Sequence, residues 1–178
     1  VSDIRKVVSP VLRTGVNSTI YYIDFSFDKL KLGGSAFAQS LDKIGKEVPT
    51  VQDSEYFANA FNAVQELINK ELILAGHDIS AGGMITTMLE MNFANTEGGL
   101  EVSLDEIPEK DLVKILFSEN PGILIQVEKT DEVEKILKKA GIAFIRLARP
   151  CDERHLLIHK DGADYQFFID HLRDVWFE

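Results

Sequence analysis

The stretch that decides the fold is HDISAGGMITTMLEMNFA, residues 77–94. Its first seven residues are polar and end in the glycine pair Gly82-Gly83, which predicts a turn at His77 to Gly83. The short apolar run before it, Leu72 to Gly76, is typical of a buried strand. After it, apolar residues recur at helical spacing on two adjacent lines: Met84, Met88 and Met91, then Ile85 and Leu89. The order is therefore strand, glycine turn, helix.

A second stretch upstream has the same order. Residues 18–25 read STIYYIDF and are rich in β-branched and aromatic side chains, which predicts a strand. A glycine turn follows at Gly33-Gly34, and Ser35 is placed to cap a short helix that runs to Leu41.

The rest of the chain alternates short apolar runs with amphipathic segments. Asp53 or Ser54 is expected to cap the longest helix, whose apolar face carries Phe57, Ala60, Phe61, Val64, Leu67 and Ile68. Further strands are predicted at 100–104, 122–127, 143–148, 155–159 and 163–169, with a hairpin turn at Asp161-Gly162. Further helices are predicted within 108–117, from a Thr130 cap to 140, and from 170 onward. The pattern predicts an α/β (α+β) fold in one domain, 1–178: a mixed β-sheet covered by helices.

Composition excludes several classes of protein. The chain has 19 Lys plus Arg against 29 Asp plus Glu, a net charge of -10, and no basic stripe, so general nucleic-acid binding is not expected. No apolar run approaches the roughly 20 residues that span a bilayer, and no signal peptide is expected at the start. The single cysteine, Cys151, cannot form an internal disulfide, which fits a reducing, cytoplasmic setting.

The two glycine turns are the candidate binding site. Glycine allows close approach of the backbone, and a helix start offers unpaired N–H groups, so both turns are plausible phosphate cradles. The candidate phosphate- or nucleotide-binding residues are Gly33, Gly34, Ser35, His77, Asp78, Ser80, Gly82 and Gly83. The alternative is that both are helix-entry turns only, with His77 and Asp78 bonding the turn together. Neither turn matches the Walker or the dinucleotide pattern.

No catalytic residue and no metal site are predicted. His155 and His159 are four residues apart on a predicted strand and share a face, but the sequence shows no third ligand near them. Glu119 and Asn120 are interpreted as a turn before a strand rather than as ligand contacts.

Four segments carry a resemblance to a known family. They are LGGSAFAQ (32–39), HDISAGGMITTMLEMNFA (77–94), FSENPGILIQV (117–127) and LRDVWFE (172–178). Together they resemble the large, single-chain form of the phosphoribosylformylglycinamidine synthase family. One position departs from its pattern, because Ala81 stands where the family usually has Asp.

The resemblance implies a fold like the C-terminal domain of aminoimidazole ribonucleotide synthetase, and the LRDVWFE ending places this domain second of two. It implies a role in converting formylglycinamide ribonucleotide to the amidine in purine biosynthesis, with ATP, Mg²⁺ and ammonia from glutamine. The implied partners are ATP or ADP, the ribonucleotide, and other domains, including a glutaminase domain. By itself the 178-residue chain is expected to be inactive, a scaffold and phosphate-handling wall.

Two alternatives remain open. One is that the chain belongs to another member of the same ATP-binding superfamily, although the GGSA turn and the LRDVWFE ending argue against this. The other is a non-catalytic module that binds a protein through an exposed apolar surface.

Overall fold

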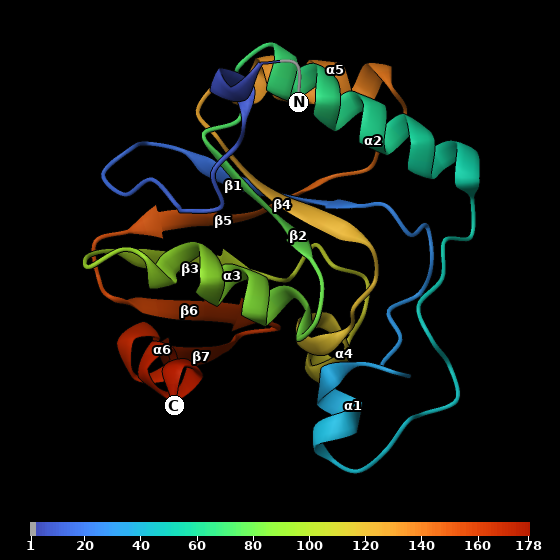
Figure 1. The fold of residues 1–178 in the computed structure, drawn as a ribbon, viewed down its shortest axis with the longest axis vertical. Helices are drawn as coiled ribbons and strands as arrows, with labels where there is room; N and C mark the ends of the chain where they lie inside the picture. The colour runs from blue at the N-terminus through green and yellow to red at the C-terminus, as the bar shows by residue number, and fades with distance from the viewer. Residues whose placement is uncertain (1–2) are drawn as a thin grey trace.

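A computed structural model describes residues 3–178 and contains one seven-stranded mixed sheet (Figure 1). The strand order is β2-β4-β1-β5-β3-β6-β7, and β3 pairs with β6 in parallel while the other neighbours are antiparallel. The strands are β1 (Thr19–Asp24), β2 (Ala75–Ile79), β3 (Gly99–Ser103), β4 (Gly122–Val127), β5 (Ile145–Cys151), β6 (His155–Lys160) and β7 (Ala163–Phe168). This confirms the predicted α/β class.

Helices cover both faces of the sheet. They are the 3₁₀ turn η1 (Ile4–Lys6), α1 (Ala36–Ser40), α2 (Ser54–Asn69), α3 (Gly83–Phe93), α4 (Leu112–Phe117), α5 (Thr130–Lys139) and α6 (Ile169–Phe177). One apolar core lies between α2, α5 and the face of β1 that carries Tyr21 and Ile23. The other lies on the opposite face, with the α3 methionine line packed against Ile20 and Tyr22. Alternate residues of β1 thus face two different cores, as the period of a strand requires.

Several helices begin at an N-cap residue whose side chain accepts hydrogen bonds from the first backbone N–H groups of the helix. Ser35 Oγ accepts from Ala38 N at the start of α1, and Asp53 accepts from Glu55 N and Tyr56 N at the start of α2. Both caps were predicted. At α5 the prediction was wrong, because Lys129 takes the N-cap position and Thr130 is the first helical residue.

The strand before the second glycine turn is displaced from its predicted place. It was expected at Leu72 to Gly76, but β2 pairs with β4 from Ala75↔Gln126 to Ile79↔Gly122. His77 and Asp78 therefore belong to the strand and not to the turn. The physical reason is that β2 is an edge strand, which presents one side to solvent and accommodates polar residues.

Two other differences have local causes. Strand β5 extends to Cys151 through Pro150, which is possible because β1 pairs with β5 only as far as Ala148 and the missing proline N–H is not needed. Phe61, predicted on the buried face of α2, is 50% exposed. The buried stripe of that helix is narrower than the sequence pattern and holds Ala60, Ala63, Val64 and Leu67.

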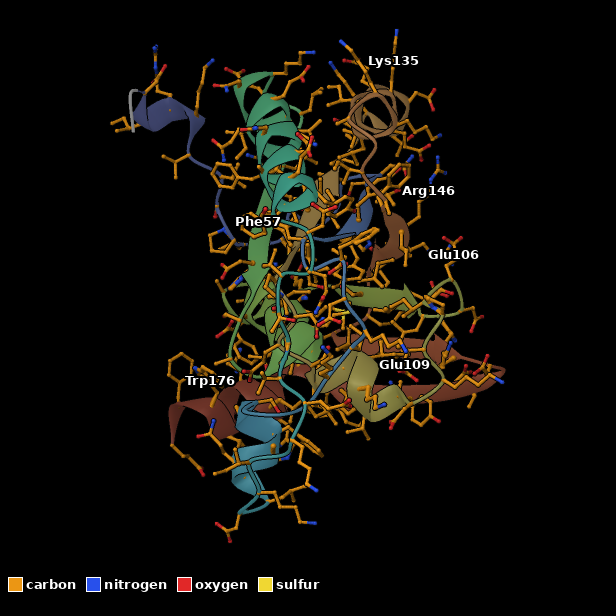
Figure 2. The ribbon with its side chains drawn as sticks, turned by 90° about the vertical axis from the view of Figure 1, so that its right-hand side faces the viewer. Phe57, Glu106, Glu109, Lys135, Arg146 and Trp176 are labelled. Atoms are coloured by element: carbon orange, nitrogen blue, oxygen red, sulfur yellow. The ribbon has the colours of Figure 1, made fainter. Side chains whose placement is uncertain are left out.

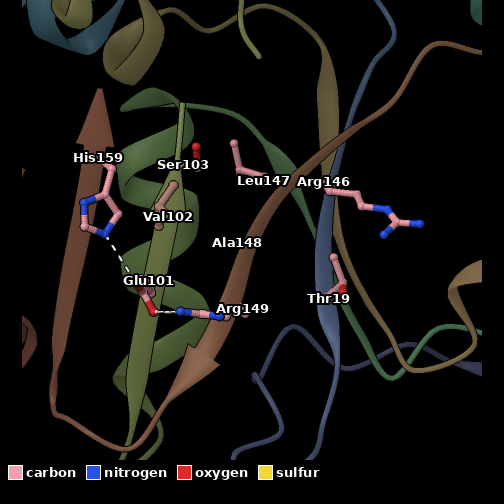
Figure 3. A pocket seen from close by; sticks show the side chains of 9 residues that line it. All are labelled: Thr19, Glu101, Val102, Ser103, Arg146, Leu147, Ala148, Arg149 and His159. Carbon is pink, nitrogen blue, oxygen red and sulfur yellow. Dashed lines mark hydrogen bonds and ion pairs between the residues drawn. The ribbon is translucent and has the colours of Figure 1, made fainter. Parts of the chain in front are cut away.

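The sheet face that α2 and α5 cover at β1 carries charged side chains on β3, β5, β6 and β7. Arg149 Nη2 lies 2.7 Å from Glu101 Oε2 (Figure 3). His159 Nδ1 lies 2.7 Å from Asp164 Oδ1. His159 Nε2 is 3.5 Å from Glu101 Oε1, so one chain of ion pairs crosses from β5 to β7. The Asp164 carboxylate raises the pKa of His159. Burial in β6 alternates, so His155 and His159 share this face, as predicted.

Glu134 connects α5 to the sheet and gives the fold a measurable pH dependence. Its carboxylate accepts hydrogen bonds from Lys138, Arg146 (Nε, 2.7 Å) and Tyr21 Oη (2.9 Å). The Lys138 and Arg146 cations hold the pKa of Glu134 at about 2. A carboxyl whose folded pKa is depressed stabilises the fold above its unfolded pKa, and this is lost as pH falls.

We expect Glu134→Gln to lower the free energy of unfolding by about 1–2 kcal/mol at pH 7, because the bonded group loses its charge. The difference from the wild type should shrink as pH falls from about 4.5 toward about 2. Urea unfolding at pH 7 and at pH 3 measures it. The control is Glu132→Gln on the same helix, whose carboxylate is 61% exposed. A loss that is the same at both pH values would contradict the assignment.

None of the helices within residues 3–178 is long and apolar enough to cross a bilayer.

Candidate functional site

The first glycine turn, Gly33-Gly34, is bonded to the loop that follows α1. Gly33 N donates to Glu47 O (2.8 Å) and Gly34 N donates to Ile44 O (2.7 Å). A Cβ on Gly33 would overlap the carbonyl oxygen of Glu47, so only glycine allows this approach. In this structure both amides are therefore hydrogen-bonded within the chain and are not available to a phosphate. Ser35 is 1% exposed, and its hydroxyl caps α1 while donating to Leu32 O.

The second glycine turn places Gly82 and Gly83 at the start of α3. Both have positive φ, 88° and 75°, which favours glycine. Gly83 N donates to Ser80 O (3.0 Å), and the Ser80 side chain faces solvent. A Cβ on Gly83 would lie 2.6 Å from Leu116 O, so this residue permits α3 to pack closely against α4. Ala81, at the position of the family Asp, is exposed.

His77 and Asp78 point away from a common ligand position. His77 Nε2 lies 3.2 Å from Glu90 Oε2 on α3, and its Nδ1 lies 2.8 Å from the Asp78 carbonyl oxygen. The Asp78 carboxylate is 76% exposed. The contact between His77 and Glu90 attaches β2 to α3.

Glu119 joins the two glycine turns, and the sequence interpretation missed it. Its Oε1 accepts hydrogen bonds from Ala36 N, at the start of α1, and from Gly82 N, at the start of α3, both at 2.8 Å. In the sequence, Glu119 is 37 positions from Gly82 and 83 positions from Ala36. A carboxylate thus lies where backbone amides of the two turns converge. An anion that used these two amides would have to displace it.

A basic hollow lies beside the first turn. It has a volume of about 570 Å³ and is lined by Gly33, Gly45, Phe37 and four lysines: Lys31, Lys43, Lys46 and Lys114. A gathering of lysines is unexpected in a chain of net charge -10. Lys31 is paired with Asp28 at 2.6 Å and Glu47 also lines the hollow, so Lys43, Lys46 and Lys114 are the lysines with positive charge to offer a phosphate group. This hollow could not be predicted from the sequence, because Lys114 comes from α4 and only the fold brings it to this loop.

A second hollow lies on the other side of α1. Ala81, Gly82 and Thr86 line it together with Phe37, Phe117 and Trp176. Phe37 stacks on Phe117 with ring centroids 4.6 Å apart. Trp176 lies at the α1 end of the molecule, opposite Lys135 of α5 (Figure 2). Helix α1 therefore separates a basic hollow from an aromatic one.

The acidic side chains of the chain do not fit a magnesium site. Within residues 3–178, the one group of three potential ligands close enough to share an ion is Cys151, Glu153 and His155. Mg²⁺ prefers oxygen ligands in an octahedron, and this group offers a sulfur and a nitrogen. Glu119, the acidic residue nearest the turns, is bonded to two amides.

The family described as "AIR synthase related protein, C-terminal domain" matches residues 17–156, most of the chain. The chain belongs to this family. The matched range contains both glycine turns, Glu119 and the basic hollow.

Among the curated relatives is a "Probable phosphoribosylformylglycinamidine synthase" of Caenorhabditis elegans, 35% identical over 194 aligned residues and 98% of this chain. Among the solved structures are "T. maritima PurL complexed with ATP" (TM-score 0.72, 15% identity) and "T. maritima PurL complexed with FGAR" (TM-score 0.71, 19% identity). Each match covers 96% of this chain, and the two cover 28% and 30% of the solved chains. At these identities the structures confirm the fold alone. The chain spans 14% of the length of the C. elegans relative.

Proposed function

We propose that this chain is a domain of a longer phosphoribosylformylglycinamidine synthase, an ATP-dependent ligase of purine biosynthesis. The observation that carries the proposal is the 35% identity to the C. elegans relative along 98% of the chain. A likeness this long favours the synthase over other members of the same superfamily, which share the fold. Activity, Mg²⁺ use, a glutaminase domain and a cytoplasmic location belong to the whole enzyme and are part of the proposal.

Within that enzyme, the basic hollow is the part of this domain best suited to a phosphate group. Its lysines can offset phosphate charge, while the Gly33 amide beside them is already bonded to the Glu47 carbonyl oxygen. The relevant ligands are ATP or ADP and formylglycinamide ribonucleotide, by analogy with the ligands named for the T. maritima structures. The amides of Ala36 and Gly82 become available to the same phosphate only if Glu119 moves.

Exposed apolar side chains support a role as one domain among several. Phe27, Phe168, Trp176 and Phe177 are each at least 57% exposed. Where such residues gather into a contiguous patch, they mark a surface that packs on other protein. The same surface fits the alternative of an interaction module, but that alternative gives no reason for the basic hollow.

The test is an assay of ADP release that depends on the ribonucleotide, with ATP, Mg²⁺ and glutamine. A polypeptide that carries this chain together with the remaining synthase domains should turn over. The 178-residue chain alone should not, because no catalytic residue is assigned to it. In the longer enzyme, Lys43→Ala with Lys46→Ala should raise the KM of one phosphate ligand about tenfold, whereas Lys135→Ala on α5 should not. No turnover by the longer polypeptide would refute the proposal.

A further inference from the structure

A three-residue connection between β5 and β6 brings the side chains of Cys151, Glu153 and His155 close together. Both strands pair with β3, one on each side: Gly99 pairs with Cys151 of β5, and Leu100 with Leu156 of β6. The connection therefore crosses the start of β3 (Figure 1). It places the last residue of β5 and the first of β6, Cys151 and His155, on either side of one glycine.

The ends of three side chains meet at this crossing. The sulfur of Cys151, a carboxylate oxygen of Glu153 and a ring nitrogen of His155 all lie within 4.8 Å of one another. Two ligands of a tetrahedral zinc ion are about 3.5 Å apart, given bonds of about 2.0–2.3 Å. Glu153 is exposed and Cys151 and His155 are half-buried, and side-chain rotation brings the three ligand atoms to that spacing.

The side chain of Arg154 fixes the backbone of the β5–β6 connection. Arg154 Nη1 donates to the carbonyl oxygens of Asn92 and Gly98, both at 3.2 Å, and its Nε donates to Asp170 at 3.0 Å. His155 N donates to Glu153 O at 2.9 Å. The Arg154 side chain thus points into the protein while its neighbours Glu153 and His155 remain at the surface. These bonds fix the backbone that carries the three ligand side chains.

We propose that Cys151, Glu153 and His155 form a binding site for Zn²⁺. A thiolate, an imidazole and a carboxylate are the three ligand types that zinc takes in proteins, and water fills the fourth position. The thiolate and the carboxylate together balance the charge of the ion. The sulfur and nitrogen select a borderline-soft cation over Mg²⁺ and Ca²⁺, which prefer oxygen.

Binding of Zn²⁺ releases one proton from the chain. The Cys151 thiol gives its proton to solvent as the sulfur–zinc bond forms, and the neutral imidazole binds through a free nitrogen. Gln166 Nε2 on β7 lies 3.3 Å from His155 Nδ1, and this amide must turn so that its oxygen accepts from Nδ1–H before Nε2 has a free lone pair for the ion. A side chain that holds the second nitrogen of a ligand histidine fixes its ring, as is common at zinc sites.

The test uses the 178-residue chain, reduced and without an affinity tag, titrated with Co²⁺ and then with Zn²⁺. Co²⁺ reports the thiolate through a sulfur-to-cobalt charge-transfer band, and calorimetry counts the Zn²⁺ bound. We expect one ion per chain and a charge-transfer band. Cys151→Ser should abolish the band, and His155→Gln should weaken Zn²⁺ binding at least about tenfold. His171→Gln, an exposed histidine elsewhere, is the control and should change neither.

Two results would overturn the proposal. One is a chain that shows no charge-transfer band with excess Co²⁺. The other is a band or a Zn²⁺ affinity that His155→Gln leaves unchanged while circular dichroism shows the variant to be folded, since Cys151 would then bind without its proposed partner.

Discussion

Gly99→Ala should lower the free energy of unfolding by about 4 kcal/mol or more, a large part of the total for a domain. A Cβ on Gly99 would overlap the carbonyl oxygen of His155 and lie 2.6 Å from that of Glu153. Both are backbone atoms of the β5–β6 crossing, which cannot move without disturbing the pairs of β3 with β5 and β6. Chemical denaturation followed by circular dichroism measures the loss.

The matched control for this prediction is Gly76→Ala in β2. Its Cβ would meet the end of the Val8 side chain at 3.3 Å, a contact that a small side-chain movement relieves. Because alanine is also better than glycine in a strand by roughly 0.5–1 kcal/mol, we expect a net change within about 1 kcal/mol. A Gly99→Ala chain as stable as Gly76→Ala would mean that the crossing is looser than its geometry indicates.

Features coded by neighbouring residues could be predicted from the sequence. The Ser35 and Asp53 caps, the α3 methionine line, strand β4 and the hairpin turn at Asp161-Gly162 each depend on a few adjacent residues. Each is also found in the structure at its predicted place. The signals are local because helices and tight turns form contacts between residues close in the chain.

Features that depend on pairing between distant segments could not be predicted. The true start of β2 is set by its register with β4, and no residue of β2 alone reveals it. Glu119 has no motif of its own, and its contacts with Ala36 and Gly82 exist only once three segments meet. Sequence reasoning therefore found the two turns but not the residue that joins them.

Gly82→Val in the longer enzyme should reduce kcat/KM by roughly 10–100-fold, if this domain contributes to a ligand site as proposed. A Cβ on Gly82 would overlap Thr86 Oγ1 and lie 2.8 Å from Thr86 Cβ, and the φ of 88° is unfavourable for a β-branched residue. Relief of both moves the start of α3 and the Gly82 N–H that donates to Glu119. A displacement of about 1 Å near a reacting ligand costs up to about 100-fold in rate. Steady-state assays at a temperature where the variant is folded measure it.

Gly141→Ala separates loss of the site from loss of stability. Gly141 follows α5 with a φ of 71°, and a Cβ there would have nothing within 4 Å, so alanine meets only the cost of its backbone conformation, about 1 kcal/mol. That residue is remote from both glycine turns, and kcat/KM should stay within about twofold of the wild type. If the two variants reduced kcat/KM equally, Gly82 would matter only as a helix-entry residue. The convergence of the two turns on Glu119 would then be a device for packing α1 against α3.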